Sequence, residues 1–115
     1  MALNNYKGVA PKADIIVVKM NLNQPDNEFL SNFVDAVKYV YDRAAELGKP
    51  AVVNASLGTY FGSHDGKDIQ AQAIDYLITE RNGRALVAAA GNAGSVPIHL
   101  KYTVTSDTAI TWLQN

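Results

Sequence analysis

Short apolar runs alternate with longer amphipathic segments along most of this chain, and this alternation constrains the fold more than any other feature. The runs at residues 14–20, 51–55 and 84–90 are continuous rather than alternating, as in strands that are covered on both faces. The two segments that separate these three runs carry apolar residues every three or four positions, which is typical of helices. The pattern predicts an α/β fold with a three-layer βαβαβ parallel-sheet core.

Two helices are expected between these runs. The first is marked by apolar positions from residue 29 to 47, with Asn27 or Ser31 as its N-cap and Gly48 as its stop. The second runs over residues 69–78. Each helix is long enough to carry the chain from one parallel strand to the next.

The end of the chain breaks this pattern. Residues 98–105 and 108–113 are rich in β-branched and aromatic residues and flank Ser106 and Asp107, which suit a two-residue turn. We therefore expect a partial α/β domain over residues 1–95 and a C-terminal β-hairpin over residues 96–115.

Composition bounds the partners of this chain. The 115 residues amount to one domain, and a hydrophobic content of 48% is enough for a core. A net charge of −1 offers no basic surface for nucleic acid, and no apolar stretch approaches the length of a membrane span. With no Cys and two separated His, no metal site and no cofactor are expected.

Small and polar residues follow two neighbouring predicted strands. Ser56, Leu57 and Gly58 follow the run at 51–55, and Asn92 follows the small residues that end the run at 84–90. The carboxyl ends of parallel strands are where open α/β sheets bind ligands, so a site is expected there. Two structural alternatives remain open: Asn92 could close a turn through its own side chain, and the other segment could be a simple strand-to-loop transition.

Two other motifs carry little functional weight. Ser63, His64 and Asp65 have the residue types of a catalytic triad, but consecutive side chains diverge, so a polar loop is expected. The glycines at 58–62 and 91–94 match neither dinucleotide-binding nor Walker A spacing, so a phosphate cradle is not favoured.

Three ordered motifs, at residues 8–11, 54–58 and 88–92, give the chain a resemblance to the subtilisin-like serine proteases. The resemblance implies that Asn92 is the oxyanion-hole amide, which stabilises the negative oxygen of the tetrahedral intermediate. It further implies that the substrate backbone pairs with Ser56, Leu57 and Gly58. One wall of the pocket for a substrate side chain would be formed by Ala89, Ala90 and Gly91.

The departures from the family pattern matter equally. In the family, the catalytic Asp and His precede the first motif and the nucleophilic Ser follows the Asn, so none has a counterpart here. His64 follows the second motif and cannot be the missing base. Some members carry an inserted β-rich domain after the Asn, and the hairpin at 96–115 would be its start.

We therefore expect a central fragment of a subtilisin-like serine endopeptidase that binds peptide or protein substrate and is inactive in isolation. The alternatives are a non-catalytic peptide-binding module or pseudoprotease, and a small nucleotide-binding α/β domain. A homodimer or higher oligomer is expected through unpaired strand edges. The resemblance suggests secretion, because most of the family is extracellular.

Overall fold

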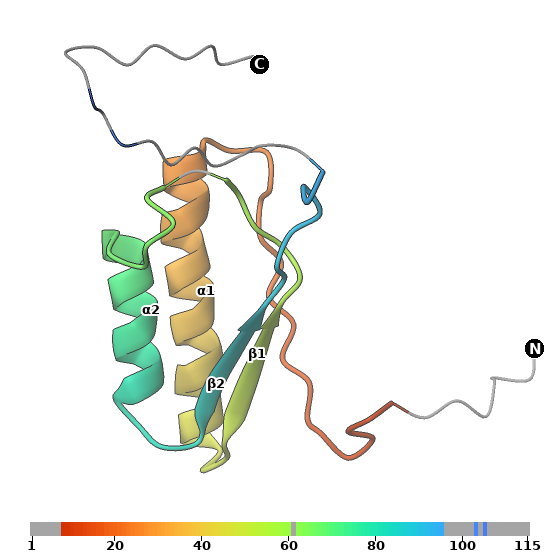
Figure 1. The fold of residues 1–115 in the computed structure, drawn as a ribbon. Coiled ribbons are helices and arrows are strands. Elements are labelled where there is room, and N and C mark those ends of the chain that lie inside the picture. The colour runs from red at the N-terminus through yellow and green to blue at the C-terminus, as the bar shows by residue number, and fades with distance from the viewer. Residues whose placement is uncertain (1–7, 61, 96–102, 104, 106–115) are drawn as a thin grey trace, which may run out of the picture.

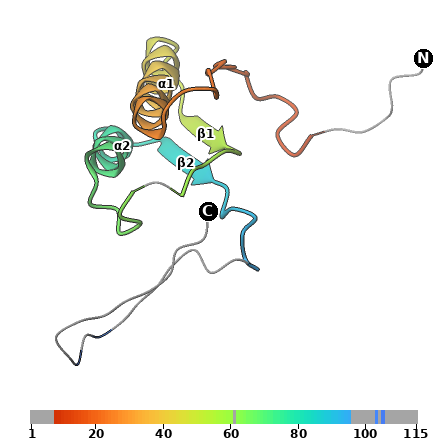
Figure 2. The ribbon, with the colours of Figure 1, turned by 90° about the horizontal axis from the view of Figure 1, so that it is seen from above.

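The structure is a computed structural model that describes residues 8–60, 62–95, 103 and 105. Four elements follow one another: helix α1 (Asp26–Glu46), strand β1 (Ala51–Ala55), helix α2 (Ile69–Thr79) and strand β2 (Arg84–Ala88). The two strands lie side by side with both helices against one face of them (Figures 1 and 2). The described residues form a small α/β unit of two layers.

Helix α1 is confirmed, but its start differs from the sequence prediction. It begins after Pro25, whose φ of −55° suits the entry to a helix, and Asp26 and Glu28 place carboxylates in the first turn. The predicted N-caps are wrong because Asn27 and Ser31 both lie inside the helix. The Ser31 hydroxyl donates to the Asn27 carbonyl at 2.9 Å, so it serves the helix interior rather than its end.

The other helix boundaries follow ordinary capping chemistry. Gly48 adopts a φ of +65° just after α1, which lets the chain turn back toward β1. Asp68 caps α2, since its carboxylate accepts from the Ala71 N–H at 2.8 Å. Helix α2 then spans Ile69–Thr79, within one residue of the range predicted from periodicity.

Strands β1 and β2 form a parallel two-stranded sheet. Their register pairs Ala51 with Arg84 and Ala55 with Ala88, so both strands end at the same edge of the sheet. The predicted strand at 51–55 is confirmed, whereas the predicted strand at 84–90 ends two residues earlier, at Ala88. Helix α2 supplies the crossover that a parallel pair needs.

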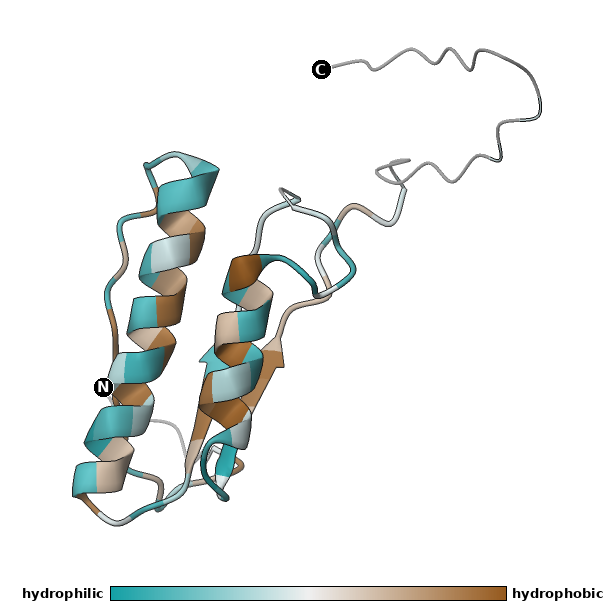
Figure 3. Ribbon diagram, turned by 90° about the vertical axis from the view of Figure 1, so that its left-hand side faces the viewer, coloured by the Kyte–Doolittle hydropathy of each residue, from teal (hydrophilic) through white to brown (hydrophobic). Residues whose placement is uncertain are grey.

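The core lies between the sheet and the two helices. Val37 and Tyr41 of α1 and Leu77 of α2 form its buried centre, and hydrophobic residues from both helices and both strands pack around them. Figure 3 shows hydrophobic residues in bands along both helices and throughout most of the strands. The Tyr41 hydroxyl donates to the Ala85 carbonyl at 2.9 Å, which joins α1 directly to β2.

The predicted three-layer core is not found among the described residues. Only one face of the sheet is covered, and on the other face Val52 is 68% and Val87 56% exposed. Apart from Asn54 and Arg84, the strand residues are nevertheless apolar on both faces, which is the pattern of strands buried on both sides.

The predicted strand at residues 14–20 is wrong. The segment runs beside β1 (Figure 1) but makes no backbone hydrogen bond to it in the described structure. A hollow of about 430 Å³ separates the segment from β1, and Ile15 and Val17 are each 83% exposed. Without a hydrogen-bonding neighbour, an apolar run cannot become part of a sheet. The predicted hairpin at 96–115 lies outside the described residues, apart from Thr103 and Thr105.

Candidate functional site

The two segments that follow β1 and β2 meet at the carboxyl edge of the sheet. The Ala89 N–H donates to the Ala55 carbonyl at 3.1 Å, which continues the contact just beyond the strands. Residues 56–60 and 89–92, which we call the strand tips, line one hollow of about 290 Å³. The sequence-predicted convergence of these two segments is therefore present in the fold.

The first strand tip has an open backbone. Within the described part of the chain, Ser56, Leu57 and Gly58 take part in no backbone hydrogen bond. A Cβ added to Gly58 would meet nothing within 4 Å, so the space beside it is clear. An extended peptide could pair with this backbone as an added strand.

The second strand tip presents a side-chain amide. Gly91 adopts a φ of +88°, a conformation that glycine tolerates best, and it redirects the chain just before Asn92. Asn92 is exposed and lines the hollow, and its side chain forms no hydrogen bond with any described residue. A turn closed by the Asn92 side chain would require such a bond. The amide N–H groups are left free to donate to a ligand.

The loop after β1 is held by contacts on both sides of Tyr60. The Thr59 hydroxyl donates to the Asp26 carboxylate at the start of α1, at 3.0 Å. His64, with a φ of +56°, places its Nε2 2.8 Å from the Tyr60 carbonyl oxygen, so the ring nitrogen must donate. These contacts connect the first strand tip to the body of the domain.

The Ser63, His64 and Asp65 segment is a polar loop and not a triad. The Ser63 hydroxyl donates directly to the Asp65 carboxylate, which leaves His64 out of the chain of hydrogen bonds. The Ser63 hydroxyl and the Lys67 N–H together hold the pKa of Asp65 below its usual value. In a triad the imidazole would lie between the hydroxyl and the carboxylate, and here it points to a backbone carbonyl.

The structure brings together every residue that the sequence placed at the site, and it adds two. Thr59 and Tyr60 also line the hollow, although the sequence motifs ended at Gly58. Tyr60 is the largest side chain there, and it reaches across to the other tip near Gly91. The signal that could have identified Tyr60 was an aromatic residue two positions after Gly58, at the start of the loop.

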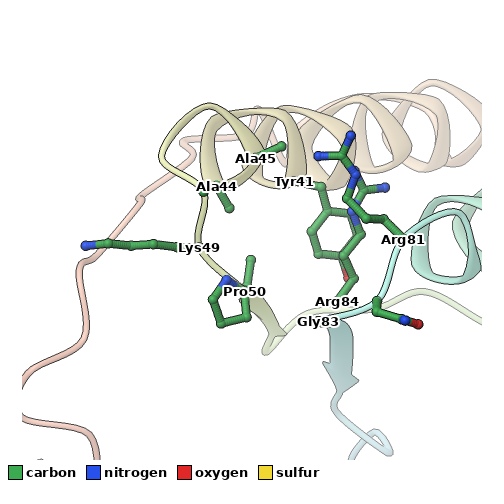
Figure 4. Close-up of a pocket in the computed structure, with 11 residues that line it drawn as sticks. Tyr41, Ala44, Ala45, Lys49, Pro50, Arg81, Gly83 and Arg84 are labelled. Carbon is green, nitrogen blue, oxygen red and sulfur yellow. The ribbon is translucent and has the colours of Figure 1, made fainter.

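Another hollow, of about 340 Å³, lies at the opposite end of the sheet, where β1 and β2 begin (Figure 4). Two of its three basic side chains, Lys49 and Arg84, bond to other groups of the protein, and Lys49 pairs with Asp14. Arg84 donates to the Leu77 carbonyl at 2.7 Å and to Glu80 at 2.8 Å, and its guanidinium lies 5.0 Å from the centre of the Tyr41 ring. Burial raises the pKa of Tyr41, and Arg84 opposes part of that rise. The contacts of Arg84 therefore link β2 to both helices at this end of the sheet.

The described residues contain no group of three or more His, Cys, Asp or Glu side chains placed to hold a metal ion. None of the helices in the same ranges is long and apolar enough to cross a membrane.

A parallel α/β unit with small-residue tips at the carboxyl ends of its strands defines a class of protein that binds ligands at that edge. The family model that matches is that of the subtilase family, over residues 1–112. The chain therefore belongs to the subtilase family.

A curated relative agrees with this assignment. The chain is 31% identical over 91 residues to a subtilisin from Bacillus sp. (strain TA39). The match covers 79% of this chain and 20% of the relative, so the chain spans a minor part of that relative's length. No solved structure matches.

Proposed function

We propose that this chain is the substrate-binding centre of a subtilisin-like serine endopeptidase. In this proposal the first strand tip pairs with the backbone of a peptide, and the residues of the second tip form a wall beside it. Asn92 donates a hydrogen bond to the carbonyl oxygen as negative charge develops on it. The nucleophile, base and orienting carboxylate come from sequence outside these 115 residues.

The observation that carries the proposal is the shared hollow between the two strand tips. The hollow combines an open backbone at Ser56–Gly58 with a free side-chain amide at Asn92. Asn92 lies 36 positions after Ser56 in the sequence. Pairing and oxyanion stabilisation need both features at one place. Family membership supplies the reaction class, peptide-bond hydrolysis.

The chemistry available to this chain alone is binding and electrostatic stabilisation. An oxyanion donor acts on a tetrahedral intermediate, and that intermediate forms only after an activated nucleophile attacks. Neither Ser63 nor His64 is positioned for that task, because they bond to Asp65 and to the Tyr60 carbonyl, respectively. We therefore propose that the isolated chain binds peptide without cleaving it.

A non-catalytic peptide-binding module remains the second candidate, because the open backbone of the first strand tip suits it equally well. The two candidates differ in the role of Asn92, which only the protease needs. A nucleotide-binding domain is disfavoured by the hollow itself. Its lining residues include neither Lys nor Arg, so no side-chain cation faces a phosphate there.

The test is a titration of the isotopically labelled 115-residue chain with N-acetyl-Ala-Ala-Leu-amide, followed by amide chemical shifts. The proposal expects the largest shifts at Ser56, Gly58 and Gly91, and no stoichiometric labelling by a fluorophosphonate probe. Inorganic phosphate at the same concentrations should leave these amides unmoved. Peptide shifts confined to residues outside the strand tips, or labelling of any Ser in the chain, would overturn it.

A further inference from the structure

The geometry points to Tyr60 as a specificity-determining residue of the strand-tip hollow, selecting uncharged aliphatic substrate side chains of moderate size over aromatic and charged ones. This inference rests on the proposed function, because it concerns the side chain that the same hollow accepts. Tyr60 belongs to neither of the two segments that the sequence motifs marked. It must touch the substrate directly for the inference to hold.

The Tyr60 ring lies beside Gly91 of the second strand tip. A Cβ built on Gly91 would come within 3.2 Å of the Tyr60 hydroxyl and 3.8 Å of two ring carbons. The ring therefore extends from the first strand tip to the second and closes one side of the hollow. Tyr60 is 51% exposed and lines the hollow, so a molecule that enters the hollow can contact its side chain.

The Tyr60 backbone is held in place by contacts on both sides. The preceding residue, Thr59, is bonded to Asp26, and the Tyr60 carbonyl accepts from His64. The backbone of Tyr60 thus has anchors on α1 and on the following loop. A ring on an anchored backbone acts as a fixed wall, and only rotation about its side-chain bonds could move it.

The side chains that line the hollow are uncharged. No Asp, Glu, Lys or Arg side chain lines the hollow, so a charged substrate side chain would lose water there without gaining an opposite charge. With Tyr60 in place, the volume is about 290 Å³, which is at the lower end of ligand pockets. The ring takes up part of the space between the two strand tips, so an aromatic substrate side chain has less room there than a smaller aliphatic one.

The test compares three peptides that differ at one position: N-acetylated, amidated Ala-Ala-Leu, Ala-Ala-Phe and Ala-Ala-Glu. Dissociation constants come from amide shifts of the full 115-residue chain. The unmodified chain should bind the Leu peptide about tenfold more tightly than the Phe or Glu peptide. Intermolecular NOEs should connect the Tyr60 ring protons with the Leu methyl groups.

The variants separate the ring from the hydroxyl and from general effects on the fold. Tyr60→Ala should reduce the preference for Leu over Phe about fivefold or more, by strengthening Phe binding. Tyr60→Phe keeps the ring and should keep the preference within about twofold. Tyr39→Ala is the matched control, because Tyr39 is 52% exposed on α1 and does not line the hollow.

Each outcome bears on one claim. If the unmodified chain binds the peptides but Tyr60→Ala leaves their ranking unchanged, the inference is wrong and the proposed function stands. If no peptide shifts the strand-tip amides of the unmodified chain, the proposed function fails and the inference fails with it. Absence of NOEs to the Tyr60 ring in a bound complex would also overturn the inference, because a purely structural Tyr60 gives none.

Discussion

At the residue scale, Gly58 and Gly91 stand on the two strand tips for different physical reasons. Gly91 has a positive φ, and a side chain there would also press on the Tyr60 hydroxyl. Gly58 has no positive φ, and its surroundings are empty. Gly91 therefore shapes the protein's own backbone, whereas the absence of a side chain at Gly58 leaves room for something outside it.

This difference predicts the effect of Gly58→Val. The new side chain should occupy the space where a peptide strand would pair, and binding of N-acetyl-Ala-Ala-Leu-amide should weaken about tenfold. The stability of the chain should change little, because nothing lies within 4 Å of the added Cβ. Amide-shift titration and urea unfolding measure the two quantities.

Gly8→Val is the control for this substitution. Gly8 is also surrounded by open space, and it does not line the hollow. The same change in side chain there should leave peptide affinity within about twofold. Equal losses of affinity at Gly8 and Gly58 would contradict the role assigned to the first strand tip.

At the element scale, Tyr41 connects α1 to the sheet. Its side chain is 1% exposed, and its hydroxyl bonds to the Ala85 carbonyl. Tyr41→Phe removes the donor and leaves that carbonyl without this partner, so the free energy of unfolding should fall by about 1 to 2 kcal/mol. Tyr76→Phe, at a position 64% exposed on α2, should change stability by less than about 0.5 kcal/mol.

The same residue predicts how stability depends on alkaline pH. Burial raises the pKa of Tyr41 above its ordinary value, so the folded protein holds the phenol proton more tightly than the unfolded chain does. The resulting stabilisation is fully present below about pH 10 and is lost as the pH rises through the raised pKa. Unfolding titrations of the unmodified chain should show a steeper alkaline loss than those of Tyr41→Phe. Parallel losses would contradict this assignment.

Local pattern was enough to predict three of the four elements closely. The helical periodicity located α1 and α2, and the run at 51–55 matched β1 because it is short and bounded by loops. Tyr41 was not predicted as a core residue, since a polar hydroxyl hides the burial of its ring until the Ala85 carbonyl appears beside it. The N-cap of α1 was misplaced because Pro25 begins the helix by its φ angle rather than by a side-chain bond.

Features that depend on contacts with residues far away in the sequence could not be predicted. The run at 14–20 has strand composition, yet a strand forms only against a neighbour, and in the described structure β1 does not pair with it. The two strand tips could be predicted to meet because parallel strands share an edge. Tyr60 could not be placed there, since its reach toward Gly91 depends on how the loop folds back.

At the scale of the whole molecule, the sheet formed by the described residues is open. Among these residues β1 has a strand partner on one side only, and the segment at 14–20 runs beside its other side without pairing. Val52 and the side chains of Ile15 and Val17 are exposed there. We propose that two copies of the chain associate through this edge, because an open edge with β-branched side chains recruits further strands.

Light scattering at high micromolar concentration tests the association. The chain should give at least the mass of a dimer, and Val52→Lys should shift it toward the monomer, because a charge on an edge strand opposes pairing. Tyr39→Lys places the same charge on α1 and should leave the mass unchanged. A monomeric mass for the unmodified chain at these concentrations would contradict the proposal.

The central claim, that the strand tips form the substrate site of a protease with Asn92 as its oxyanion donor, is tested most directly in the longer protease that the proposed function assigns to this chain. There, Asn92→Ala should lower kcat by about 10² to 10³, with KM nearly unchanged, because the donor acts mainly in the transition state. This corresponds to roughly 3 to 4 kcal/mol of lost stabilisation. Cleavage of peptides at the parental rate by a folded Asn92→Ala enzyme would contradict the account.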